Sequence, residues 1–86
     1  MYQYYTVEIK KNKDGDFEHT LHWHYDEDNE QARLKGEAKF HEILSRAATS
    51  YYAEHAAILF SSQGKRIMDM CYIHTEKEEV TQNAES

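Results

Sequence analysis

Residues 31–50, QARLKGEAKFHEILSRAATS, are the stretch that decides the fold. When successive residues are placed 100° apart, its apolar side chains fall on one stripe and most of its charged side chains fall elsewhere. The stripe consists of Ala32, Gly36, Phe40, Ile43, Leu44, Ala47 and Tyr51. This periodicity predicts an amphipathic helix. Because such a helix is rarely stable alone in water, it needs a sheet on which to bury the stripe.

Acidic residues mark the start of this helix. Negative charge is favourable beside the unpaired N–H groups and the positive dipole end of a helix. The acids are Asp26, Glu27, Asp28 and Glu30. Asp28 is the predicted N-cap, with Gln31 three residues on, as in a capping box. No Gly or Pro marks the other end, which we place near Thr49, where the pattern is lost.

Two alternating stretches precede the helix, Tyr2–Lys11 (YQYYTVEIKK) and residues 17–25 (FEHTLHWHY). Their aromatic and β-branched residues predict two strands, and Asp14-Gly15 predicts a hairpin turn between them, because Gly accepts a positive φ without steric cost. One side of the hairpin is apolar and the other is mixed. The apolar side holds Tyr5, Val7, Ile9, Phe17, His19, Leu21, Trp23 and Tyr25, and the mixed side includes Tyr2, Tyr4, His22 and His24. We expect the mixed side to face away from the helix.

A second hairpin follows the helix, with strands predicted at Glu54–Ser61 (EHAAILFS) and residues 66–74 (RIMDMCYIH). A two-residue turn at Gln63-Gly64 sets the pairing of these strands. It predicts Leu59–Met68, Ala57–Met70 and His55–Tyr72 on one side, and Phe60–Ile67, Ile58–Asp69 and Ala56–Cys71 on the other. Both sides of this hairpin are therefore apolar.

The order β-β-α-β-β predicts a single α+β domain over residues 1–74, a four-stranded antiparallel sheet with one helix packed on one face. The strand orders 2-1-3-4 and 1-2-4-3 both fit this succession. We favour 2-1-3-4, because it places the hydrophobic segment AAILF in the middle of the sheet, away from an open edge. Residues 75–86, TEKEEVTQNAES, are acidic and show no periodicity, so we expect a disordered tail.

Composition limits the classes of protein that fit. Eighty-six residues bury only a small core, and a net charge of −6 opposes binding to phosphate backbones. The single Cys71 cannot form an internal disulfide and reads as a small buried hydrophobe, which suits a reducing compartment. The start of the chain does not resemble a signal peptide, and its apolar runs are too short to span a membrane. We expect a cytoplasmic protein that does not bind membranes.

A single helix covers one face of a four-stranded sheet, and the other face also looks apolar. Self-association through that face would remove it from water, so we expect a homodimer or a complex with another protein. The expected interface residues are Tyr2, Tyr4, Ile58, Phe60, Ile67 and Ile73. This pattern favours a non-enzymatic protein-interaction module.

Six histidines raise the question of metal binding. His22 and His24 lie two residues apart on a strand and point to the same side, and Asp26 continues the row, so these three could ligate a metal such as zinc. The spacing is permissive, and polar outer-face residues are the simpler interpretation. The sequence holds no phosphate-binding loop, paired carboxylates or activated nucleophile, so we expect neither an enzyme nor a cofactor.

Two further functions fit parts of the sequence. The acids around Asp28 and in the tail could imitate nucleic-acid charge, as in an inhibitor encoded by a mobile element, although a helix N-terminus explains the first group. Tyr2 and Tyr4 could instead stack on the bases of single-stranded nucleic acid while Lys10, Lys11 and Lys13 contact phosphates. The acidic total makes nucleic acid an unlikely partner.

The segments KFHEILSRAATS (residues 39–50) and AEHAAILFSSQG (residues 53–64) resemble a group of small uncharacterised proteins of anaerobic gut Firmicutes and their phages and mobile elements. The resemblance covers most of the chain and extends to its size, its hairpin start and its Gly turn. It implies a bacterial or phage accessory protein, and it implies no catalytic activity.

Overall fold

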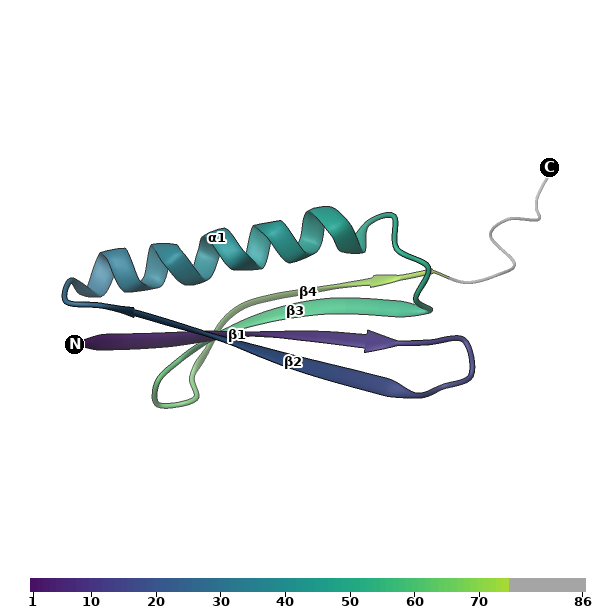
Figure 1. Ribbon diagram of the computed structural model, residues 1–86, viewed down its shortest axis with the longest axis horizontal. Helices are drawn as coiled ribbons and strands as arrows, with labels where there is room; N and C mark the ends of the chain where they lie inside the picture. The colour runs from purple at the N-terminus through teal and green to yellow at the C-terminus, as the bar shows by residue number, and fades with distance from the viewer. Residues whose placement is uncertain (75–86) are drawn as a thin grey trace.

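The computed structural model describes residues 1–74, and the predicted tail at 75–86 lies outside the described residues. The elements are β1 (Tyr2–Lys11), β2 (Phe17–Asp26), α1 (Asn29–Ala47), β3 (Glu54–Ser61) and β4 (Arg66–Ile73). One helix lies along one face of the sheet (Figure 1). The α+β class and the predicted order of elements are confirmed. In the described part of the chain, no helix combines the length and the apolar character needed to cross a membrane.

The sheet is antiparallel throughout, in the order β2-β1-β3-β4. This confirms the order that we favoured, with AAILF on the interior strand β3. The predicted register of the second hairpin also holds, with one exception. Phe60 faces Arg66 instead of Ile67, because the register shifts between Leu59 and Phe60 and leaves Ile67 as the extra residue.

Local signals explain where the elements begin and turn. Asp28 is the N-cap of α1, as predicted, and its carboxylate accepts a hydrogen bond of 3.2 Å from the N–H of Gln31. Gly15 has φ +97° in the first hairpin turn, a value that L side chains rarely adopt. The helix ends at Ala47, two residues before the predicted end, so the assignment of Tyr51 to the apolar stripe is wrong. That side chain is almost fully exposed.

The helix packs on the side of the first hairpin that we expected to be open, and this expectation is therefore wrong. Tyr4, Thr6 and Glu8 of β1 are buried beneath α1, and the apolar set containing Tyr5 and Val7 faces away. The register between β1 and β3 explains the difference. It pairs Thr6 with Leu59 and Glu8 with Ala57, which places these β1 residues on the same side as the buried residues of β3.

Candidate functional site

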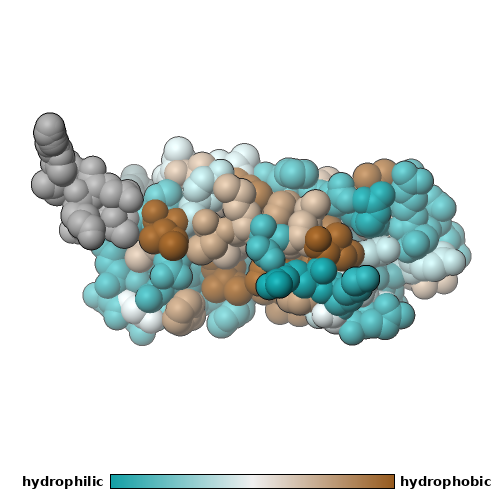
Figure 2. Space-filling view, turned by 180° about the vertical axis from the view of Figure 1, so that it is seen from behind, coloured by the Kyte–Doolittle hydropathy of each residue, from teal (hydrophilic) through white to brown (hydrophobic). Residues whose placement is uncertain are grey.

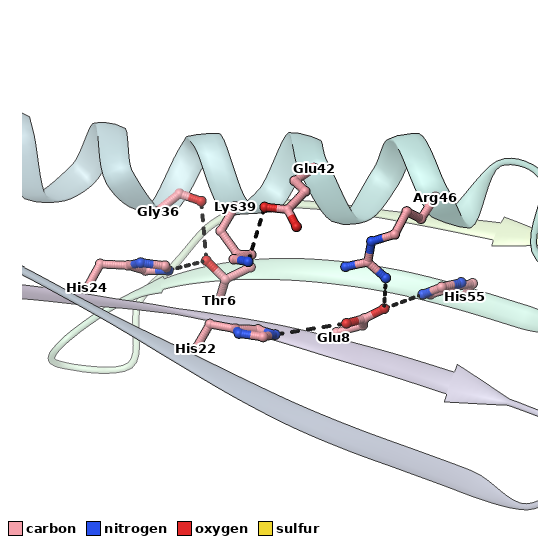
Figure 3. A network of polar contacts seen from close by, with 9 residues as sticks. All are labelled: Thr6, Glu8, His22, His24, Gly36, Lys39, Glu42, Arg46 and His55. Atoms are coloured by element: carbon pink, nitrogen blue, oxygen red, sulfur yellow. Dashed lines mark hydrogen bonds and ion pairs between the residues drawn. The ribbon is translucent and has the colours of Figure 1, made fainter.

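A group of polar side chains lies between α1 and the sheet, and we call it the Glu8 cluster (Figure 3). Its members are Glu8, His22, Arg46 and His55, which Figure 3 draws, and Ser50, which contacts His55. His55 Nε2 lies 2.6 Å from Glu8 Oε2, Arg46 donates to the same oxygen over 3.2 Å, and Ser50 Oγ lies 3.0 Å from His55 Nδ1. The side chains of Glu8 and His55 are 5% and 2% exposed. A carboxylate thus lies in the core with its charge compensated from both β3 and α1.

The Glu8 cluster perturbs the acidity of its own carboxyl group. Burial alone would raise the pKa of Glu8, but the hydrogen bonds from His55 and Arg46 and the positive charges of Arg46 and Lys10 outweigh burial and hold this pKa below its ordinary value. Glu8 therefore stays ionised at neutral pH. Its other oxygen, Oε1, lies 3.9 Å from His22 Nε2, a buried nitrogen without a hydrogen-bond partner.

Ser50, His55 and Glu8 form a hydroxyl–imidazole–carboxylate series, which is the arrangement of an activated nucleophile. Two features oppose catalysis here. The imidazole is enclosed, with Tyr52 packed edge-on at 5.5 Å, and Arg46 neutralises the carboxylate that would have to stabilise an imidazolium ion. Together with Arg46, the series links the end of α1 to the following loop, β3 and β1, so its structural effect is to fix the helix to the sheet.

The residues considered for metal binding do not converge. His24 Nε2 lies 2.9 Å from Thr6 Oγ1, which also donates to the carbonyl of Gly36 over 3.2 Å, and Asp26 pairs with Lys35 at 3.1 Å. Burial, followed by the positive charges of His22, Lys39 and Lys35, lowers the pKa of His24. Across residues 1–74, no three side chains of the kinds that bind metals are grouped to hold an ion. His22, His24 and Asp26 therefore do not form a three-ligand group in the described residues, and metal binding through them stays a prediction.

The acids at the helix start have structural partners. Asp26 accepts a hydrogen bond from the N–H of Asp28 in addition to its ion pair with Lys35, and these two contacts lower the pKa of Asp26. Asp28 caps the helix. Because these carboxylates already cap the helix or pair with Lys35, helix formation explains them more directly than imitation of nucleic acid does.

The sheet face away from α1 carries the largest apolar surface, and we call it the uncovered face. Strand pairing assigns its members, because residues that face each other across antiparallel strands point to the same side. Its central members are Tyr5, Val7 and Ile9 of β1, Leu21, Trp23 and Tyr25 of β2, Ala56, Ile58 and Phe60 of β3, and Asp69, Cys71 and Ile73 of β4. Toward the strand ends the same pairing adds Gln3, Lys11, Phe17, His19, Glu54 and Arg66. Figure 2 shows the back of the molecule, with the helix still above the sheet and not looking directly onto this face; hydrophobic patches lie along its middle between hydrophilic residues. The charged residues of this face pair within the chain, Asp69 with Arg66 at 3.1 Å and Lys11 with Glu54 at 3.7 Å.

Three rings form a row across the uncovered face. Tyr5 lies 4.8 Å from Trp23 and 5.0 Å from Phe60, centroid to centroid, and the planes of Tyr5 and Phe60 differ by 17°. These separations match the spacing of neighbouring strands, so the rings of Tyr5 and Phe60 stand upright on the sheet and pack against each other. Upright rings present edges outward. Bases stack on ring faces, so this row suits protein side chains better than nucleic acid.

The expected interface residues fall in different places. Ile58, Phe60 and Ile73 lie on the uncovered face, and Ile67 is the exposed extra residue of the β3–β4 irregularity. Tyr4 belongs to the core beneath the helix, where its hydroxyl donates to Asn29 over 2.7 Å, so its assignment to the uncovered face is wrong. Tyr2, two residues away on the same strand, shares the helix side and is half-exposed, so its assignment is wrong as well.

Other residues were predicted to be buried and are exposed in the structure. Cys71 was predicted to be buried, but it is an exposed free thiol on the uncovered face. Partial burial and the negative charge of Glu54 raise its pKa, so the thiolate is disfavoured. Leu21 and Trp23 are about half exposed, although their alternation predicted core positions. Alternation had grouped these residues correctly, and only the side that the helix covers was misassigned.

A shallow depression of about 580 Å³ lies where the start of β1, the start of α1 and the β3–β4 turn meet. Tyr2, Gln3, Asn29 and Gln63 contribute to its lining. The lining includes the hydroxyls of Tyr2, Tyr4, Ser61 and Ser62, and none of the lining side chains is a carboxylate, imidazole or thiol that could activate them.

Comparison with known proteins adds no relative, because the chain matches no family model, no curated protein and no solved structure. The resemblance to proteins of gut Firmicutes and their mobile elements therefore stays a prediction.

Proposed function

We propose that this protein is a non-enzymatic interaction module that forms a homodimer by packing the uncovered face against the same face of a second copy. The observation that carries this proposal is the extent of apolar surface on that face. All four strands contribute to it, and its charged residues are neutralised in pairs within the chain, Asp69 with Arg66 and Lys11 with Glu54. An apolar sheet face that no helix covers is the usual mark of a protein–protein contact.

The dimensions of the face suit an interface of standard size. Four strands spaced about 4.8 Å apart and eight residues rising about 3.3 Å each give a plan area of roughly 500 Å². Side-chain relief makes the accessible area larger than the plan area, so two such faces approach the standard buried area of about 800 Å² per partner. Sheets stacked in this way pack about 10 Å apart, which leaves room for one interdigitated layer of side chains.

A second copy suits this face better than an oppositely charged partner, because the face offers little charge to complement. Asp69 is neutralised within its own chain by Arg66, and Lys11 and Glu54, at the far end of the sheet, pair with each other at 3.7 Å. Two identical faces can therefore meet without bringing uncompensated like charges together. The edges of the upright rings, at the centre of the face, would interdigitate with the aliphatic side chains of the partner.

Sedimentation velocity at chain concentrations from about 1 to about 100 µM tests the proposal. We expect a species of at least about 20 kDa, twice the chain mass of 10.2 kDa. Leu21→Glu should stay folded and lose the sheet-face contact, because each copy would bury a carboxylate at a position that is now a half-exposed Leu. Leu34→Glu is the matched control, since Leu34 is 40% exposed on the helix and Leu21 is 51% exposed on the sheet. It should leave the dimer intact.

Trp23 gives a second measurement, because it is the only tryptophan and is 47% exposed on the uncovered face. Its fluorescence should shift to the red as the protein is diluted and the ring returns to water. A monomer at about 100 µM with an unshifted spectrum would overturn the proposal. A dimer that survives Leu21→Glu and dissociates with Leu34→Glu would place the contact on the helix instead.

A further inference from the structure

The strand β4 is an open edge of the sheet. Among the described strands it pairs with β3 alone, and the helix packs mainly against β1, β2 and β3. Apolar side chains on both of its faces are consequently exposed, including Met70 at 43% on the helix side and Ile73 on the uncovered face. Long edge strands with apolar side chains are the sites at which another strand adds to a sheet.

The other edge, β2, is less suited to pairing. It carries Glu18, Asp26 and three histidines among its ten residues, and the helix covers one of its faces. By contrast, the charges of β4 are Arg66 and Asp69, which neutralise each other within the strand. Charged and covered edges discourage pairing, whereas a neutral apolar edge permits it.

The backbone geometry shows which groups of β4 are free to bond. The N–H of His74 donates to the carbonyl of Ala53 over 2.7 Å, so this residue points its backbone groups toward β3. The direction alternates along an antiparallel strand, so Tyr72, Met70 and Met68 also point theirs toward β3. Ile73, Cys71 and Asp69 therefore direct their N–H and C=O groups to the open edge.

From this geometry we infer that β4 pairs with β4 of a second copy, in an antiparallel register centred on Met70, to make one continuous eight-stranded sheet. A two-fold axis perpendicular to the sheet keeps each residue on its own face. Odd-numbered residues must therefore pair with odd-numbered residues of the second copy, and even-numbered with even-numbered. Centring on Met70 places Met68 opposite Tyr72 of the second copy and Asp69 opposite its Cys71. The outward groups of Asp69 and Cys71 then bond reciprocally across the axis.

Charge selects this register over one centred on Asp69. Centring on Asp69 would place two carboxylates directly opposite each other, and like charges in that position destabilise a strand pair. In the Met70 register the residue on the axis is apolar, and each Asp69 faces a Cys71 whose thiol is neutral because its pKa is raised. The edge of β4 thus complements a second copy of itself, and no foreign strand is needed.

Disulfide trapping tests the register directly. In a Cys71→Ser background, Met70→Cys would place the two thiols directly opposite each other at the two-fold axis. This position is a non-hydrogen-bonded pair of the antiparallel ladder. Cα atoms in such a pair lie about 4.5 Å apart, within the range that a disulfide spans. We expect mild oxidation to convert Met70→Cys to a disulfide-linked dimer. Met68→Cys, the matched control on the same face, should form no disulfide-linked dimer. Equal trapping of the two variants would overturn the register.

Amide hydrogen exchange on the unmodified protein keeps the inference falsifiable even where a cysteine variant fails to fold. The amides of Asp69, Cys71 and Ile73 point outward, so they should be protected at high protein concentration and should lose protection on dilution. Cys71→Pro should abolish this protection while leaving β3–β4 pairing intact, because Pro is tolerated where an edge N–H faces outward. Fast exchange of these three amides at every concentration would overturn the inference.

The same measurements separate this contact from the proposed sheet-face dimer. Leu21→Glu should remove the sheet-face contact and leave Met70→Cys trapping unchanged, whereas Cys71→Pro should remove the edge contact and leave the Trp23 spectrum unchanged. Loss of Met70→Cys trapping together with the sheet-face dimer would show one shared interface and would overturn the edge contact as a separate site.

Discussion

Replacing Glu8 tests whether the Glu8 cluster holds the helix to the sheet. Glu8→Gln keeps the shape of the side chain and removes its charge. The amide oxygen can still accept a hydrogen bond from His55 Nε2, so the loss is confined to the charged component of that bond and to the contact with Arg46. Hydrogen bonds to charged groups contribute about 1.5–3 kcal/mol and neutral ones about 1 kcal/mol, and Arg46 is half-exposed and can be rehydrated. We expect Glu8→Gln to lower the free energy of unfolding by about 1–2 kcal/mol.

Glu8→Ala should cost more, about 3–4 kcal/mol, because it leaves the buried His55 Nε2 without an acceptor and opens a cavity beneath the helix. Urea unfolding of the wild type and both variants at pH 7, followed by circular dichroism, measures these differences. Arg46→Gln is the matched control, and its effect should stay below about 1 kcal/mol because that side chain is half in water.

The pH dependence gives an independent check. Because the folded pKa of Glu8 lies below its ordinary value of 4.5, the unfolded chain takes up the proton first as the pH falls. The stability that this carboxylate contributes is therefore fully present above about pH 4.5 and is lost as the pH falls through the folded pKa. Glu8→Gln should flatten the stability curve in that acid range. A variant as stable as the wild type at pH 7, with the same acid slope, would refute the structural role of the Glu8 cluster.

Two further predictions concern the contact between helix and sheet. Gly36→Ala should destabilise the fold by about 1 kcal/mol despite the higher helix propensity of Ala, because the added Cβ would lie 2.5 Å from Leu59 Cδ1 in the packed core. Leu59→Val should relieve this clash. A higher melting temperature for Gly36→Ala alone than for the wild type would contradict the packing. The folded pKa of His24 lies below its ordinary value of 6.5, so the stability that its neutral ring contributes is present above about pH 6.5 and is lost as the pH falls. Urea midpoints at pH 7 and pH 5.5 should therefore differ less for His24→Gln than for the wild type, and an unchanged difference would count against the buried neutral imidazole.

The sequence by itself determined the elements of this protein. Strand and helix periodicities, the acid at Asp28 and the glycines at 15 and 64 are local signals, and the structure has β1 and β3 with the predicted bounds and Asp28 as the N-cap. Alternation also sorted the residues of each hairpin into the correct two sets. The reason is that backbone geometry places every second side chain on one face, whatever lies nearby.

Only the tertiary structure decided which set the helix covers. On β1 the covered set includes Thr6 and Glu8, which are polar, and the more apolar set stays outside, so hydrophobicity alone predicts the reverse. Burial of Glu8 becomes favourable because His55 and Arg46, 47 and 38 residues away along the chain, converge on one carboxylate oxygen. Partners so distant in sequence meet only once the register between β1 and β3 is set, and no local pattern encodes that register.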